Sequence, residues 1–394
     1  MRKPLGILLM LLLIGGQAVE AQRADAGIRL KAYQRALASG NQEEAKSELV
    51  AAKEYIDEAM EKEADDPKTW YYAGEIYMGF FFLASDPEVQ EKYITEENIK
   101  KGLDAYKHHI QMDKKRKDDM EEEIRTKMYR FRAMFLNQAA SFMQNQQDSL
   151  ALGAYQGSIQ LMDVVGEVDS VSYFNGGIMA ENLGNWEVAE EFYGKAAEVD
   201  FAGNIAAPRY AKALYKNGKD EEAYAAMEKG ATKYGSDKDF ITEEVNFYLL
   251  TGDNEKAKGA VTRLIDTDPN NPQLHFIAGT IYDESGQFEE ALNAYDKALE
   301  IEPDYFDANF NRGVMLYNRG ADKLKEVDSI DDFALMKEET EKAKEFFKDA
   351  VPYMEKCHEL DPKERNTINV LKTLYLQLGM NDKAQEMNEK LKNL

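Results

Sequence analysis

Apolar residues recur at intervals of three and four along most of the chain, the spacing that predicts amphipathic helices. At 257–285 the segment AKGAVTRLIDTDP is followed by NPQLHFIAGTIYDES, two apolar stripes separated by a turn that contains proline. Pro269 and Pro303 each follow such a stripe, and proline cannot continue a helical hydrogen-bond ladder. The pattern therefore predicts an all-α chain built from pairs of short helices.

One six-residue motif, glycine followed by an acid and an alanine, returns along the chain. It reads GNQEEA at 40–45, GNWEVA at 184–189, GKDEEA at 218–223, GDNEKA at 252–257, GQFEEA at 286–291 and GMNDKA at 379–384. From Gly184 to Gly320 the glycines stand 34 residues apart, and fixed periods of about 20 to 50 residues are typical of solenoids. Glycine can adopt the left-handed conformation that ends a helix, and the acid suits the positive start of the next one. We interpret the motif as a joint without chemistry of its own.

The repeat at 272–305 resembles the tetratricopeptide repeat family. Its small and aromatic positions are Gly279, Tyr282, Gly286, Ala291, Tyr295, Ala298 and Pro303. Other copies retain Tyr248, Gly252, Ala257 and Pro269, then Gly177, Gly184, Ala189, Tyr193 and Ala196, and Trp70, Gly74 and Tyr77. The resemblance implies a right-handed superhelix of about eight or nine helix pairs.

Two departures from the period predict irregular regions. Gly320 to Gly379 spans 59 residues, so we place an insertion at about 321–345 and expect lengthened helices that form a projecting arm. The second region begins at 80–98, which predicts off-pattern pairs near 24–64, 66–113 and 117–162. We therefore divide the chain into a leader at 1–21, irregular pairs at 22–165 and a regular array at 166–394.

The first residues resemble a secretory signal, with Arg2 and Lys3 before a short apolar run and small residues up to Ala21. We expect cleavage after Ala21 and export, most simply to the periplasm, although an uncleaved anchor or secretion to the medium is an alternative. The single cysteine, Cys357, lies far from the position of a lipid-modified cysteine. Without 1–21 the chain carries 47 basic and 72 acidic residues, a charge of −25, which disfavours nucleic acid and anionic membranes as partners.

The sequence contains no recognisable catalytic or cofactor-binding motif, so we expect no enzyme activity, cofactor or metal. His108 and His109 are adjacent, point to different faces of a helix and are interpreted as ordinary surface histidines. The segment DTDPNN at 266–271 lacks the glycine and glutamate of a calcium loop and predicts a turn. Cys357 falls where the repeat needs a small buried residue.

By the family pattern, the first helices of the pairs line a concave surface for partners. The positions expected on it are Tyr71, Phe174, Asn182, Arg209, Lys212, Lys216, Asn246, Phe276, Phe310, Asn311, Tyr317 and Asn318. The basic segment RYAKALYK either receives an acidic partner or is a solvated face. The phenylalanines are either contact anchors or packing between repeats.

These features predict a non-enzymatic scaffold of the cell envelope that binds a protein or peptide segment on its concave face. The alternative is an exported protein that binds glycans or small ligands on a similar framework. Such glycan-binding relatives are usually lipid-anchored and rich in tryptophan, whereas this chain has only Trp70 and Trp186.

Overall fold

A computed structural model describes residues 5–62, 65–112, 119–327 and 329–394, with side chains from residue 22 onwards. The described residues form helices and no strand, as expected for an all-α chain. They divide into two compact units, Met1–Gly203 and Asn204–Leu394. This division does not coincide with the expected boundary at 165/166, which marks a change in regularity and lies within the first unit.

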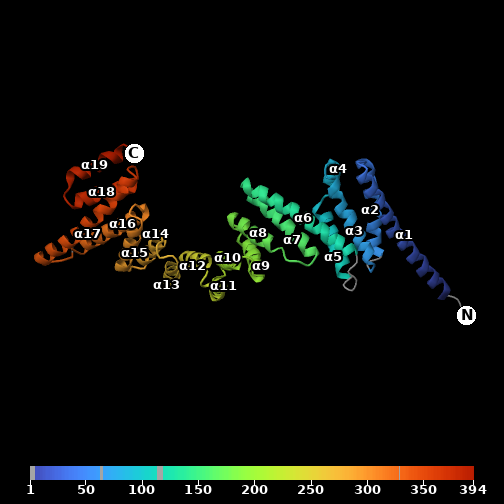
Figure 1. Ribbon diagram of the computed structural model, residues 1–394, viewed down its shortest axis with the longest axis horizontal. Helices are drawn as coiled ribbons and strands as arrows, with labels where there is room; N and C mark the ends of the chain where they lie inside the picture. The colour runs from blue at the N-terminus through green and yellow to red at the C-terminus, as the bar shows by residue number, and fades with distance from the viewer. Residues whose placement is uncertain (1–4, 63–64, 113–118, 328) are drawn as a thin grey trace. The chain divides into compact units, whose positions relative to one another are not determined.

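The first unit contains four helix pairs with an extra segment inside the second (Figure 1). Its elements are α1 (Leu5–Ala38), α2 (Gln42–Lys62), α3 (Pro67–Gly79), the 3-10 helix η1 (Phe80–Leu83), α4 (Pro87–Lys92), α5 (Glu96–Met112), α6 (Asp119–Gln144), α7 (Asp148–Val164), α8 (Ser170–Asn182) and α9 (Trp186–Glu198). The irregular pairs are α1/α2, α3/α5 and α6/α7, in the predicted places. The extra segment is η1 with α4, which accounts for the off-pattern sequence after residue 80.

The second unit continues the same arrangement with regular short pairs, one long pair and a final short pair. Its helices are α10 (Gly203–Lys216), α11 (Asp220–Tyr234), α12 (Lys238–Thr251), α13 (Asn254–Thr267), α14 (Pro272–Glu284), α15 (Phe288–Ile301), α16 (Phe306–Val327), α17 (Phe333–Leu360), α18 (Arg365–Gln377) and α19 (Asn381–Lys392). Across the described residues there are nine pairs, in agreement with the expected eight or nine.

The repeated glycine is a joint, as predicted. At Gly252 the backbone is left-handed, with φ +73°, and its N–H donates to the carbonyl of Leu249. The N–H of the next residue, Asp253, donates to Tyr248 at 2.9 Å, and the Asp253 carboxylate caps α13 by accepting from Lys256 N–H. A side chain at Gly252 would meet nothing within 4 Å. Glycine is therefore required by backbone conformation at this position and not by space.

Other glycines permit close helix packing. A Cβ at Gly279 in α14 would lie 2.6 Å from the Tyr295 ring of α15, which is fully buried. Gly320 belongs to this second kind, although it continues the 34-residue spacing. It lies within α16, and a Cβ there would lie 2.7 Å from the Phe347 ring of α17. The chain turns only after Val327 because the insertion lengthens this pair.

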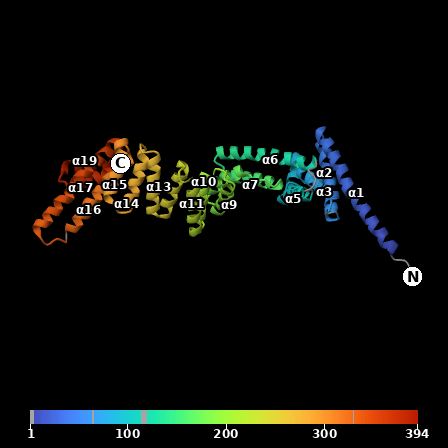
Figure 2. The ribbon, with the colours of Figure 1, turned by 60° about the horizontal axis from the view of Figure 1, so that its bottom comes forward.

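The insertion produces the long pair that the sequence predicts. Helices α16 and α17 have 22 and 28 residues, against 13 and 14 in α14 and α15. Figure 2 shows the two long helices extending together beyond the neighbouring pairs of their unit. We refer to the distal part of this hairpin, residues 321–345, as the arm.

Helix α1 continues without a break past Ala21, the expected cleavage position. Gln22 and Arg23 are half-buried, Arg23 forms an ion pair with Asp66, and Ala26 is fully buried. The folded part of the first unit thus includes the residues directly after Ala21. Among the residues searched, no helix has the length and apolar character needed to cross a membrane.

Candidate partner-binding surface

We use the name first-helix face for the surface formed by the first helices of the pairs. The residues expected on this face in the second unit differ in exposure. Asn246 on α12, Asn318 on α16 and Lys216 on α10 are exposed. The half-buried members of the set are Arg209, Lys212, Phe276, Phe310, Asn311 and Tyr317. Helices α14 and α16, which carry five members, are in contact with each other. The structure therefore brings Phe276 and the α16 residues to adjacent first helices.

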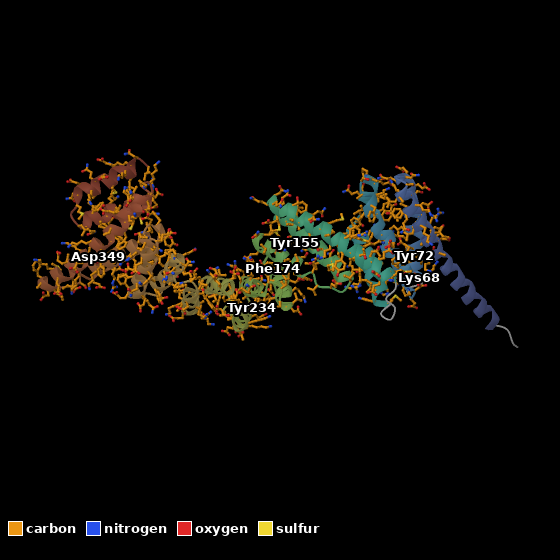
Figure 3. The ribbon with its side chains drawn as sticks, viewed as in Figure 1. Lys68, Tyr72, Tyr155, Phe174, Tyr234 and Asp349 are labelled. Carbon is orange, nitrogen blue, oxygen red and sulfur yellow. The ribbon has the colours of Figure 1, made fainter. Side chains whose placement is uncertain are left out.

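The phenylalanines take part in aromatic packing. The Phe276 ring lies 5.3 Å from that of Tyr305, which precedes α16, and Phe310 stacks on Phe306 of its own helix at 6.0 Å between centroids. In the first unit, Phe174 lies on α8 (Figure 3). Its ring lies 6.0 Å from that of Phe201. These contacts support the packing interpretation. Each ring is only half-buried, so part of it is also available to a partner.

The basic segment on α10 interacts with its own chain. Nη2 of Arg209 lies 3.3 Å from Oε1 of Glu243 on α12, and the Arg209 side chain is 27% exposed. The Tyr215 ring meets Phe247 edge-on at 6.2 Å. Arg209 is therefore partly neutralised by a neighbouring repeat, which lowers its capacity to attract an acidic partner.

Tyr71 was expected on the binding surface, and this expectation is wrong. Its side chain is 8% exposed, and its hydroxyl donates to Glu123 of α6 at 2.8 Å. Burial raises the pKa of Tyr71, with the nearby carboxylates of Glu75 and Glu123 adding to the effect. The reason is that side chains of α6, the first helix of the third pair, pack against α3, where Tyr71 shares a core cluster with Ile124 and Met128. On α3, Glu75 accepts from Tyr106 at 2.7 Å and pairs with Lys127.

Asn182 is exposed at the end of α8 and is held by its own chain. Its Nδ2 donates to the Asp148 carboxylate at the start of α7 at 3.1 Å. The contact orients the amide, and the other face of the side chain is accessible.

An apolar patch that the sequence analysis missed lies between η1 and α6 in the first unit. Phe82 of η1 is 58% exposed and lies 6.2 Å from the ring of Phe131 on α6. Met134, one turn further along α6, is also 58% exposed. The only available signal was the FFFL sequence at 80–83, which interrupts the repeat period.

The candidate metal and thiol groups have structural roles. His109 is 1% exposed, so its interpretation as a surface histidine is wrong; its Nδ1 lies 2.8 Å from the carbonyl of Pro67. His108 is exposed and packs its ring 4.3 Å from Trp70. No group of acids, histidines and cysteine suited to a metal occurs among the described residues.

Cys357 is fully buried, as expected. Burial raises the pKa of its thiol to about 12, and Sγ donates to the Phe306 carbonyl at 3.7 Å. The segment at 266–271 ends α13 at Thr267 and then forms the expected turn at 268–271, in which the Asn271 side chain caps α14 by accepting from Gln273 N–H. Neither feature provides a reactive group.

The pairs, their glycine joints and their close glycine–tyrosine contacts define a helical-repeat protein. Residues 279–320, which include α15 and the end of α14, match a family model described as TPR repeat. The family match thus identifies a tetratricopeptide repeat at 279–320. Repeats of this family serve in general as scaffolds for protein–protein interaction and are generally non-catalytic.

Several solved structures resemble the chain at low identity. The C-terminal part of a TPR repeat-containing protein from Cytophaga hutchinsonii is 15% identical, covering 64% of this chain and 92% of its own, with a TM-score of 0.48. YrrB, described as a TPR protein with an unusual peptide-binding site, is 18% identical over 44% of this chain and 88% of its own, with a TM-score of 0.35. MamA from Desulfovibrio magneticus RS-1 is 16% identical, covering 50% of this chain and 96% of its own, with a TM-score of 0.35.

Proposed function

We propose that this protein is a non-enzymatic scaffold, exported to the cell envelope, that binds a protein or peptide segment on the first-helix face of its second unit. The observation that carries the proposal is the side-chain set of α14 and α16. Phe276, Phe310 and Tyr317 are half-buried there, beside Asn311 and the exposed Asn318. Partly exposed aromatic rings provide contact area, and amides can hydrogen-bond to the backbone of an extended partner.

Export is supported by the character of the first residues and by the folded residues that follow them. Arg2, Lys3 and the apolar run before Ala21 have the order of a secretory signal. Cleavage after Ala21 leaves Arg23 and Ala26, with their contacts, in the folded protein. Intact-mass measurement of the protein recovered from the periplasmic fraction tests this part, because it must show a chain that begins at Gln22. A full-length chain in the cytoplasmic fraction contradicts it.

Binding on the first-helix face is tested by a matched pair of substitutions. Asn318→Arg places a large cation at an exposed position of α16, on the first-helix face. Asn293→Arg places the same group at an exposed position of α15, the second helix of its pair. Both act on surface asparagines in helices, so their effects on folding are expected to be similar and small. Crosslinking from intact cells identifies the partner, and its affinity for the purified variants is then measured by calorimetry.

We expect Asn318→Arg to weaken binding at least about tenfold and Asn293→Arg to leave it within about twofold. Equal effects of both variants contradict binding on this face. Soluble oligosaccharides are added to the same purified protein as a separate arm. A higher melting temperature with oligosaccharide, together with no captured protein, contradicts the scaffold and favours the glycan-binding alternative.

A further inference from the structure

The arm extends a short repeat helix pair into solvent. α17 has 28 residues and α15, the equivalent helix of the preceding pair, has 14. The 14 additional residues lengthen the helix by about 21 Å at 1.5 Å per residue. In Figure 2 this hairpin leaves the stack of its unit, and its end has no neighbouring pair in that unit. The end of the arm is therefore available for contact.

Two apolar side chains at the end of the arm are not used in folding. Phe333 is 74% exposed, the largest exposed fraction of any large apolar side chain among the described residues, and Leu335 is 46% exposed. The core cluster of the long pair includes Phe347 and partly buried Leu324, and neither Phe333 nor Leu335 belongs to it. Exposing a phenylalanine to this extent forgoes most of the free energy that burial of such a side chain provides.

Local hydrogen bonds order the start of α17 at the end of the arm. The Asp332 carboxylate accepts from Leu335 N–H at 2.9 Å and caps α17. The N–H of Ser329 donates to Glu326, and that of Ile330 donates to Val327, at 3.2 and 3.0 Å. Phe333, the first residue of α17, is thus presented at the capped start of a helix. Such preorganisation reduces the entropy that is lost when the side chain is immobilised in a partner.

The charge around Phe333 indicates the kind of partner. The arm, residues 321–345, contains nine acids and five basic residues. Lys323 pairs with Glu326 and Glu339, and Lys342 pairs with Glu338 and Glu339. Asp331 and Asp332, which directly precede Phe333, have no cation partner within the described part of the arm. A second copy of the chain carries the same acidic arm and a net charge of −24, which opposes self-association. A different protein with basic side chains is favoured.

We propose that the end of the arm, residues 329–339, is a docking element that inserts Phe333 into an apolar pocket edged by lysine or arginine on a different protein. Leu335 adds apolar contact beside the ring, and the carboxylate of Asp331 faces the basic edge. This surface is separate from the asparagines and aromatic rings of the first-helix face. The arm can therefore bind a second partner or a second part of the same one.

The test replaces Phe333 with p-benzoylphenylalanine in the full chain, expressed in cells of its native source. The matched control carries the same photoreactive residue at Leu376 of α18, which is 54% exposed and lies away from the arm. After irradiation, mass spectrometry identifies the crosslinked protein and the residue in it that reacted. The second component is the same crosslinking with Asp331→Lys added, which reverses the charge beside Phe333 without removing the Asp332 cap.

We expect position 333 to give one discrete adduct with another protein, at a residue that lies beside lysine or arginine. Position 376 is expected to lack this adduct, and the charge reversal to reduce it at least about fivefold. With the purified partner, Phe333→Ser is expected to weaken binding at least about tenfold, while Leu376→Ser leaves it unchanged. Because Phe333 contributes little to the fold, the Phe333→Ser variant should melt at the temperature of the unaltered protein.

Four results overturn the proposal. They are the absence of an adduct at 333, the same adduct at 333 and 376, an adduct only with a second copy of this chain, and an unchanged affinity in Phe333→Ser. A second copy of the chain offers a site for the ring, because a cavity of about 320 Å³ beside α17 is lined by Phe288, Phe346 and Tyr353. An adduct in that cavity would show that the arm binds a second copy of this chain and not a different protein.

Discussion

The carboxylate of Asp169 joins three helices of the first unit, and its removal provides a quantitative test of how these repeats hold together. Its side chain is completely buried, and it accepts from Nε and Nη2 of Arg132 on α6 at 3.0 and 2.7 Å. It also accepts from the hydroxyls of Ser158 on α7 and Ser172 on α8 at 2.6 and 2.8 Å. Asp169 directly precedes α8, whose first turn it caps.

The expected cost of Asp169→Asn follows from these contacts. Breaking a fully buried ion pair by removing one charge typically costs about 3 to 5 kcal/mol. Two features reduce the cost at this site, since asparagine retains one acceptor oxygen and the Arg132 side chain is 25% exposed and can be partly rehydrated. We expect a loss of about 2 to 3 kcal/mol. Arg132→Met is expected to cost at least as much, because the carboxylate left behind is fully buried.

The assay is native-state hydrogen exchange of the α6, α7 and α8 amides, since repeats open locally and a single global transition would average the effect. The double variant Asp169→Asn, Arg132→Met completes a cycle. Its loss of stability should be smaller than the sum of the two single losses by at least about 1 kcal/mol, because both charges are removed together and neither is left buried without its partner. A loss below about 0.5 kcal/mol for Asp169→Asn, or strict additivity, would refute the reasoning.

The pH dependence of the same site has a defined sign. Burial opposes ionisation of Asp169, but the hydrogen bonds from Arg132, Ser158 and Ser172 outweigh it and lower its pKa below the ordinary aspartate value. A lowered folded-state pKa means that this stability is fully present above about pH 4, the unfolded value, and is lost as the pH falls through the folded value. The difference between the protein and Asp169→Asn should be constant near neutrality and shrink only below about pH 4.

Three further predictions concern the joints, the close contacts and the thiol. Gly279→Ala places a Cβ against the buried Tyr295 ring and should lower the free energy of unfolding by about 1 to 3 kcal/mol. Gly259→Ala, where the new Cβ meets open space in a helix, should raise it by about 0.5 to 1 kcal/mol. Urea unfolding compares the two variants. Gly286→Ala should cost about 1 kcal/mol because φ there is +71°, and an equal effect at Gly259 would contradict this reason. Cys357, with its pKa raised to about 12, should react with a maleimide at pH 8 only after unfolding, and rapid labelling of the folded protein would show that the thiol is accessible.

The helix pairs could be predicted from the sequence because their determinants are local. The left-handed glycine at Gly252, the capping carboxylate at Asp253 and the proline after α13 act within a few residues of one another. The length of the insertion between Gly320 and Gly379 follows by subtraction of the period, so the long pair was also predictable. Gly320 illustrates the limit, since a glycine in the expected register packs against Phe347 and makes no turn.

The candidate surface was less predictable because exposure depends on the neighbouring helices. Tyr71 occupies a first-helix position, but α6 covers it, and its hydroxyl contacts Glu123, 52 residues away in the sequence. His109 is buried through a contact with Pro67 that its own helix does not reveal. Phe82 and Phe131 are brought together from two elements that follow no repeat period.

The sequence by itself determined the helical class, the period, the joints and the position of the arm, since these depend on spacing and on local backbone preferences. Tertiary structure alone decided which side chains remain available. It buried Tyr71, neutralised Arg209 with Glu243, and left Phe333 in solvent. The physical reason is that burial and ion pairing are properties of side chains far apart in the sequence, and their proximity exists only after the pairs have stacked within a unit.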